Sequence, residues 1–417
     1  MGLTLSSNSS VNSYTPSCFD DDLCVYIMSF LEFDTIKVCF FVSKQWNMMA
    51  RKTPVSLMMR YNYHNGLEKR LELMSKCQHV NITSLDLGQN SIEKPSAIKN
   101  IVQSKIASRL KVLKLDYNYS LRDSALSLIT TSTKLTNLQV LNVNHCNITD
   151  IGVEALAQSV IMSNLRELHL QGNDISEKGA RALSTSKFMS KLQILHLGYF
   201  KMEITRIGSK GAHYLAHGNS KFTELYLSFC DIGDSGAIEI GKSPHMSNLT
   251  VLNLRSNNIG NEGAMALIGS DYLTTLTFLD LSGNRLEKSG AKLIALKLSN
   301  LTTLRVGSNE IQEEGAISIV TSPHMSNLTC LSMSYNSLGV NFAEKLASSP
   351  YLSKLKSLDL CGNQLGDEGT IIIASSGENL KNLTQLVHEL SHNQSTTVIL
   401  KKFGKQEISH RQSQQQQ

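Results

Sequence analysis

The stretch that decides the fold is Leu249–Leu267, which reads LTVLNLRSNNIGNEGAMAL. It contains leucines in the alternation L-x-L, then an asparagine, an isoleucine and a glycine-alanine pair, and Leu276–Ile294 repeats the pattern as LTFLDLSGNRLEKSGAKLI. Because side chains alternate between the two faces of a strand, L-x-L predicts a short strand with both leucines buried. The leucines after the glycine recur at helical spacing and predict a helix.

The same pattern recurs along most of the chain. Its central leucine returns at intervals that range from 25 residues (Leu279 to Leu304) to 30 residues (Leu195 to Leu225). The eleven clear copies are Leu85, Leu113, Leu141, Leu168, Leu195, Leu225, Leu252, Leu279, Leu304, Leu331 and Leu358, and a degenerate twelfth unit starts near Leu383. One strand–helix unit cannot bury its apolar face alone, whereas stacked units share a continuous core.

Two further positions of the repeat have expected roles. The position after the strand is usually asparagine, whose amide can bond backbone groups at a buried turn, and it is cysteine at Cys146 and Cys230. Phe200 is an exception in a unit that runs long, so we predict a local bulge near residues 199–208. Pairs such as Gly236-Ala237 are expected to open the helices, with glycine making a tight turn and alanine allowing close packing.

These recurring positions resemble the leucine-rich-repeat family, in its longer ribonuclease-inhibitor-like class, over roughly residues 82–393. The resemblance implies an α/β leucine-rich-repeat horseshoe, with parallel strands on the concave face and helices on the convex face, that binds proteins. We assign residues 82–400 to this domain. Residues 401–417 are basic and then Gln-rich, and we expect a disordered tail there.

The strand residue between two leucines points away from the core, to the concave face. Neighbouring parallel strands lie about 4.8 Å apart, so these side chains form a ladder, in which His169, His196 and Tyr226 are consecutive. The predicted target-binding residues are His169, His196, Tyr226, Asn253, Arg255, Asp280 and Arg305. The alternative for each is an ordinary solvated strand face. The two histidines have no evident third ligand, so we expect no metal site there.

Residues 17–50 do not fit the repeat, and their apolar spacing predicts short helices. This spacing resembles the F-box at Phe19, Leu23, Ile27, Leu31, Ile36, Val42 and Trp46. The pattern departs from the family at Asp20, where the F-box usually has proline, and at Phe19, where it has leucine. The resemblance implies a small all-α unit that binds the adaptor subunit of a cullin–RING ubiquitin ligase, and the alternative is a helical cap. We expect residues 1–16 to be disordered and residues 51–81 to form a helical linker that caps the first repeat.

Composition excludes several other classes of protein. Lys and Arg total 40 and Asp and Glu total 35, and the resulting net charge of +5 gives no case for nucleic acid binding. The eight cysteines contain no C-x-x-C, so we expect reduced thiols and a cytoplasmic or nuclear protein. Met1–Ser6 fits the N-myristoylation pattern at Gly2, but no basic cluster follows, so we expect no stable membrane association.

One string resembles a zinc protease motif, H-E-x-x-H at residues 388–392. It coincides with the strand of the twelfth repeat, where two histidines would not converge as they do on a helix. We therefore expect a non-catalytic protein without a cofactor. The first hypothesis is a substrate receptor of a cullin–RING (SCF-type) ubiquitin ligase, with a target protein on the concave face. The alternative is a leucine-rich-repeat regulator of an enzyme or small GTPase that has no ubiquitin ligase role.

Overall fold

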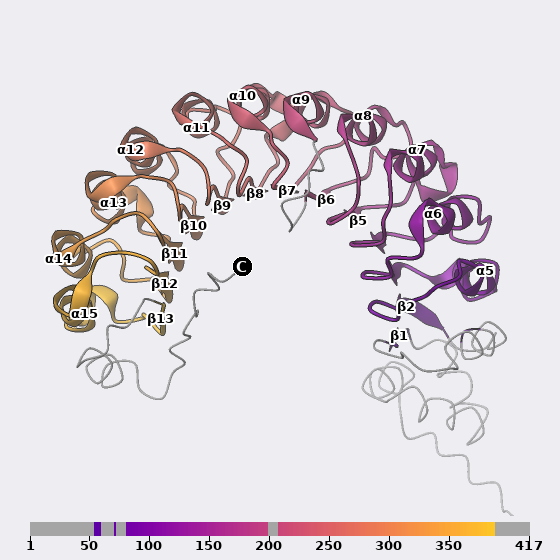
Figure 1. Ribbon diagram of the computed structural model, residues 1–417, viewed down its shortest axis with the longest axis horizontal. Helices are drawn as coiled ribbons and strands as arrows, with labels where there is room; N and C mark the ends of the chain where they lie inside the picture. The colour runs from indigo at the N-terminus through magenta and orange to yellow at the C-terminus, as the bar shows by residue number, and fades with distance from the viewer. Residues whose placement is uncertain (1–53, 60–70, 72–80, 199–206, 388–417) are drawn as a thin grey trace, which may run out of the picture.

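The computed structural model describes residues 54–59, 71, 81–198 and 207–387 of the chain. Within these residues a 13-stranded sheet follows the order of the sequence from β1 to β13. All neighbouring strands are parallel. Figure 1 shows the strands on the inner side of an arc and the helices on its outer side. The predicted horseshoe is confirmed.

The strands are short, and most have three residues. They are β1 (Val55–Met58), β2 (Ile82–Asp86), β3 (Val112–Lys114), β4 (Val140–Asn142), β5 (Glu167–His169), β6 (Ile194–Gly198), β7 (Glu224–Ser228), β8 (Val251–Asn253), β9 (Phe278–Asp280), β10 (Thr303–Arg305), β11 (Cys330–Ser332), β12 (Ser357–Asp359) and β13 (Gln385–Val387). The outer helices are α5 (Ser96–Val102), α6 (Arg122–Thr130), α7 (Asp150–Gln158), α8 (Glu177–Thr185), α9 (Gly208–His217), α10 (Gly233–Lys242), α11 (Asn261–Ile268), α12 (Glu287–Lys297), α13 (Gln312–Val320), α14 (Val340–Ser348) and α15 (Gly366–Ala374).

The core runs unbroken under the sheet. Leu252 lies opposite Leu279 in the register of β8 and β9, and the central leucines of the other described repeats pair in the same way. All eleven predicted central leucines are buried. The leucine register expected from the sequence is therefore confirmed.

Buried asparagines join each repeat to the next. Asn309 is 0% exposed, and its side-chain Nδ2 donates hydrogen bonds to the carbonyls of Leu281 (2.8 Å) and Gly307 (3.0 Å). Its backbone N–H donates to Oδ1 of Asn336 in the following repeat, at 3.2 Å. At the cysteine variant of this position, the Cys146 thiol donates to the carbonyl of Leu115 at 3.1 Å. Either side chain thus supplies a donor that a buried carbonyl needs.

The glycine-alanine pairs do not open the helices, contrary to the sequence prediction. α10 begins at Gly233, whose φ of +61° makes the tight turn, and Gly236-Ala237 lies inside the first turn of the helix. A Cβ on Gly236 would come within 3.0 Å of the Cβ of Ala212 on α9. The glycine therefore lets adjacent helices pack closely. The sequence pattern had instead predicted that it makes the turn into the helix.

The sheet also starts one strand earlier than predicted. Residues 51–81 were expected to form a helical linker, but Val55–Met58 forms β1, which pairs with β2. Its VSLM sequence places Val55 in the core, and its backbone covers the edge of β2 that would otherwise be unpaired. The F-box-like segment at 17–50, residues 1–16, most of the expected bulge at 199–208, the motif at 388–392 and the tail at 401–417 lie outside the described residues.

Candidate protein-binding face

The predicted concave ladder forms in the register that the sequence indicates. His169 lies opposite His196 in the pairing of β5 and β6, and His196 lies opposite Tyr226 in the pairing of β6 and β7. The ladder continues through Asn253 and Asp280 to Arg305. Six of the seven predicted binding residues therefore lie along one row, and Arg255 lies two residues beyond Asn253, past the end of β8.

The rings of three consecutive residues of the ladder form a continuous stack, which we call the ring stack (His169, His196 and Tyr226). Ring centroids of His169 and His196 are 4.1 Å apart with planes at 24°, and those of His196 and Tyr226 are 3.9 Å apart at 12°. Neighbouring strands lie about 4.8 Å apart, so rings at the same register are close enough to stack, and these rings lie closer together than that spacing. Because the ring faces pack against one another, the stack presents ring edges to the inner side of the arc.

Two glutamates hold the outer rings of this stack. Nε2 of His169 lies 2.6 Å from Oε1 of Glu167, and the Tyr226 hydroxyl donates to Oε2 of Glu224 at 2.9 Å. Each glutamate precedes its ring by two residues on the same strand, so both side chains emerge on the concave face. These bonds limit the rotation of the rings and leave carboxylates along one border of the stack.

The ring stack is a mostly neutral surface. Burial, together with a smaller contribution from the neighbouring His169, lowers the pKa of His196 to about 3. The pKa of Tyr226 is raised by burial and by its contact with Glu224, so its phenol stays protonated. At neutral pH the central imidazole is uncharged, which favours contact with flat or apolar groups of a partner.

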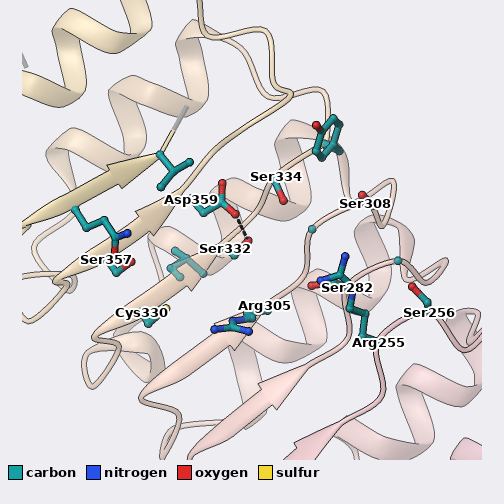
Figure 2. A pocket seen from close by; sticks show the side chains of 16 residues that line it. Arg255, Ser256, Ser282, Arg305, Ser308, Cys330, Ser332, Ser334, Ser357 and Asp359 are labelled. Carbon is teal, nitrogen blue, oxygen red and sulfur yellow. Dashed lines mark hydrogen bonds between the residues drawn. The ribbon is translucent and has the colours of Figure 1, made fainter. Parts of the chain in front are cut away.

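A second region of the concave face is hollow and polar. Figure 2 shows this hollow, of about 400 Å³, with side chains from successive repeats pointing into it. Its polar lining includes two arginines and several hydroxyls, Arg255, Arg305, Ser256, Ser282, Ser308, Ser332, Ser334, Ser357 and Tyr335. We call this region the arginine–serine hollow. Its donors suit carboxylate or other anionic groups of a partner.

Two aspartates form contacts with the polar side chains of the arginine–serine hollow. The guanidinium NH1 of Arg305 lies 3.8 Å from Oδ2 of Asp280, and the Ser332 hydroxyl donates to Oδ2 of Asp359 at 3.0 Å. Asp280 is only 1% exposed, and its Oδ1 also accepts the backbone N–H of Ser282. The sequence predicted Asp280 as a target-binding residue, but its burial makes it a support for Arg305 instead.

Sequence reasoning found some of these residues and missed others. The predicted Arg255 and Arg305 both line the hollow and are exposed, and the predicted Asn253 accepts a hydrogen bond from Ser228 at 2.9 Å. The serines beyond the strand ends, such as Ser256 and Ser308, were missed. Their recurrence just before the buried asparagine was the available signal. The predicted adaptor-binding residues and Gly2 lie outside the described residues.

Three further observations bear on the prediction that the protein has no metal site, disulfides or membrane anchor. The described residues contain one group of three potential metal ligands, His213, His217 and Glu239, on the convex side. The described cysteines, Cys146, Cys230, Cys330 and Cys361, are free thiols. In this part of the chain, no helix has both the length and the apolar character needed to cross a bilayer.

Comparisons with known proteins recognise the repeats. The family model described as Leucine Rich repeat matches residues 134–157, 162–184, 218–241, 245–267, 272–295, 297–320 and 351–374. No curated protein matches the chain. Among solved structures, the chain is similar to one described as the Rad7 and Elc1 complex in yeast (TM-score 0.47, 17% identity, 82% of this chain and 88% of that chain).

A second solved structure is the internalin inlF of Listeria monocytogenes str. 4b F2365 (TM-score 0.42, 18% identity, 91% of this chain and 94% of that chain). The family matches fall on strand–helix units that the structure places in one continuous sheet. The matched segments within residues 134–374 are therefore leucine-rich repeats, and the same strand–helix arrangement extends over residues 82–387.

Proposed function

We propose that this array binds a protein target on its concave face and that the ring stack is the centre of the contact. The supporting observation is the stack itself, in which three half-buried rings lie 3.9–4.1 Å apart on consecutive strands. Glu167 and Glu224 fix the two outer rings, so binding orders few side chains. Rigid aromatic residues of this kind are frequent anchors at protein interfaces.

The target contact extends into the arginine–serine hollow. Tyr226 and Asn253 are adjacent rungs, and Arg255 follows Asn253 on the same side of its strand end. A partner segment that crosses these strands would contact the edges of the rings and place an acidic group near Arg255 and Arg305. Complementary charge of this kind contributes to orientation and to the rate of association.

The test compares proteins that co-purify with the wild type and with a His169→Ala, His196→Ala, Tyr226→Ala variant. A matched control replaces three exposed convex residues, Glu154, Lys178 and Lys242, by alanine. We expect the concave variant to lose a set of partners that the convex variant retains, with both variants folded by circular dichroism. Equal recovery by all three proteins would place the target contact elsewhere.

We also propose that the chain is a substrate receptor of a cullin–RING (SCF-type) ubiquitin ligase. This proposal rests on the F-box-like spacing of residues 17–50, in which Phe19, Leu23, Ile27, Leu31, Ile36, Val42 and Trp46 would contact the adaptor subunit. The chain would act by holding its target near a ubiquitin-charged enzyme, which raises the effective concentration of the reactants.

Adaptor co-purification tests this second proposal. Truncating a buried interface anchor typically costs at least about 2 kcal/mol, so Trp46→Ala or Ile27→Asp should weaken adaptor binding about thirtyfold or more. A Lys178→Ala variant, changed on the exposed surface of α8, is the control. If the wild type recovers no adaptor, the departures at Phe19 and Asp20 have abolished that contact.

That outcome would favour the alternative, a regulator of an enzyme or small GTPase without a ubiquitin ligase role. Affinity purification with and without residues 1–52 separates the two. The ligase receptor should lose its adaptor and keep its targets when the segment is removed, whereas the regulator should keep all its partners.

A further inference from the structure

A cluster of ligand-type side chains lies on the convex side, away from the face proposed for target binding. His213 and His217 are one helical turn apart on α9, and Glu239 lies on α10, the next helix along the outer side of the arc (Figure 1). Nδ1 of His213 is 2.8 Å from Oε2 of Glu239, and Nε2 of His217 is 2.9 Å from the same oxygen. Three potential ligand atoms from two repeats therefore converge at one point.

The spacing of these atoms is close to what a metal ion requires. Zinc lies about 2.0–2.2 Å from imidazole nitrogen and carboxylate oxygen, so ligand atoms in a tetrahedral site are roughly 3.4 Å apart. The three atoms here all lie within 4.8 Å of one another, and the two hydrogen bonds need to open by only about half an ångström. All three side chains are at least 38% exposed, so they can move by that amount.

The helices that carry the cluster are held at a fixed separation. Gly236 on α10 faces the Cβ of Ala212 on α9 so closely that an added Cβ would lie 3.0 Å away. Glu239 follows Gly236 by three residues on the same helix, and His213 follows Ala212 directly. The close helix contact therefore fixes the separation of the two helix backbones that carry the carboxylate and the two imidazoles before any ion binds.

We propose that His213, His217 and Glu239 bind one zinc ion, with water in the remaining coordination position, and that the ion clips α9 to α10. Two imidazoles and a carboxylate are a ligand set that zinc accepts. The alternative is a histidine–carboxylate ion pair only.

The experiment starts from a background that removes the other histidine pair of the same spacing. Residues 388–392 also contain H-x-x-x-H, so the full chain with His388→Ala and His392→Ala is the reference protein. After chelator treatment and dialysis, it is titrated with zinc chloride in competition with a chromophoric chelator. We expect one zinc ion per chain, and a rise in melting temperature with zinc, because an ion that binds only the folded state stabilises it.

Two further variants in this background locate the ion. His213→Ala with His217→Ala should lower zinc affinity by more than about 100-fold, beyond the loss typical of outer-shell residues, and should abolish the melting shift. A His245→Ala, His324→Ala variant, which removes two other exposed histidines, should retain both. Glu239→Gln keeps both imidazoles and should bind with intermediate affinity.

A spectroscopic readout makes the result independent of small folding changes. Cobalt(II) in a tetrahedral site with nitrogen and oxygen ligands absorbs visible light strongly, and we expect this band in the reference protein and its loss in the His213→Ala, His217→Ala variant. If the reference protein binds no zinc, or if that variant binds zinc as tightly as the reference does, the cluster is an ion pair only and the proposal is wrong.

Discussion

The two regions of the concave face differ in chemistry although they are built on the same scaffold. The ring stack on β5–β7 is aromatic, central to the sheet and bordered by Glu167 and Glu224. The arginine–serine hollow on β8–β13 combines two exposed arginines with Asp359 and many hydroxyls. Beneath both, the central leucines and buried asparagines repeat without change in role. The buried positions thus set the spacing between neighbouring strands. The residues on the concave face are free to differ from one repeat to the next.

This difference indicates how a partner would lie. A segment that crosses from β5 to β10 would meet the edges of the stacked rings next to carboxylates, and then exposed guanidinium groups. We expect the partner to place apolar or basic residues on the ring stack and acidic residues over Arg255 and Arg305. Changes in the shared core, in each region separately and in the charge of one ring test this difference.

The largest expected effect comes from the shared core. Leu252 and Leu279 are 0% and 1% exposed, and both lie under the boundary between the two regions. Replacing either by alanine leaves a cavity and should lower the free energy of unfolding by about 2–5 kcal/mol. Urea denaturation measures this, with Met265→Ala as the control, since Met265 is 55% exposed on α11. Near-wild-type stability of both leucine variants would contradict the idea of one core beneath both regions.

Changing each region separately gives the next largest effect, on binding. The His169→Ala, His196→Ala, Tyr226→Ala variant should weaken capture of its principal target by at least about 2 kcal/mol, or about thirtyfold. Arg255→Ala with Arg305→Ala should weaken capture of the same target less, and chiefly at low salt, because exposed charges are screened. Quantitative co-purification at two salt concentrations measures both. Equal effects of the two variants at both salt concentrations would show that the regions do not divide the contact as proposed.

A buried amide under the hollow should have a smaller effect on stability than a core leucine. Asn309→Ala removes one hydrogen bond to each of the carbonyls of Leu281 and Gly307, which keep their bonds from Asn284 and from the backbone of Gly283. We expect a loss of about 1–3 kcal/mol in the free energy of unfolding. Asn300→Ala is the control, because that asparagine is exposed and its one side-chain bond, to Thr274, is at the surface. A loss no greater than the control's would mean that the asparagines do not join the repeats.

The scaffold could be predicted from the sequence because its positions recur. An L-x-L pattern that returns at least every 30 residues leaves one register in which all the leucines are buried. The same alternation then places His169, His196 and Tyr226 on adjacent rungs, as observed. The repeated leucine positions could be assigned with the help of every copy of the pattern. Once the buried leucines are placed, the alternation of side chains along a strand places the residues of the concave face.

The features that the sequence did not predict depend on single positions. The repeat pattern does not predict the contact between the Asp280 carboxylate and Arg305, because this contact depends on the rotamer of one side chain. β1 was missed because VSLM lacks the leucines of the repeat, and its pairing depends on the open edge of β2. The cluster of His213, His217 and Glu239 joins two helices, and the histidine spacing on α9 was the only signal in the sequence.

The smallest expected effect concerns the charge of the central ring. The pKa of His196 falls from 6.5 to about 3 on folding, chiefly because of burial. Between these values the unfolded chain binds a proton that the folded chain does not, so the stability from this residue is complete above pH 6.5 and is lost as the pH falls toward 3. Because the ring is partly exposed, we expect a change of about 1 kcal/mol or less between pH 7 and pH 5.

A variant that keeps the ring and removes its titration isolates this effect. His196→Phe retains an aromatic ring between His169 and Tyr226, so carboxylates elsewhere should contribute equally to both proteins. The wild type should lose more stability than the variant between pH 7 and pH 5 in urea denaturation. Proton NMR should show the His196 ring unprotonated at pH 5, where a solvated histidine is largely protonated. Parallel stability curves together with a His196 ring that protonates near pH 6.5 would mean that the rings open to water in solution, and the ring stack would then resemble the arginine–serine hollow in its hydration.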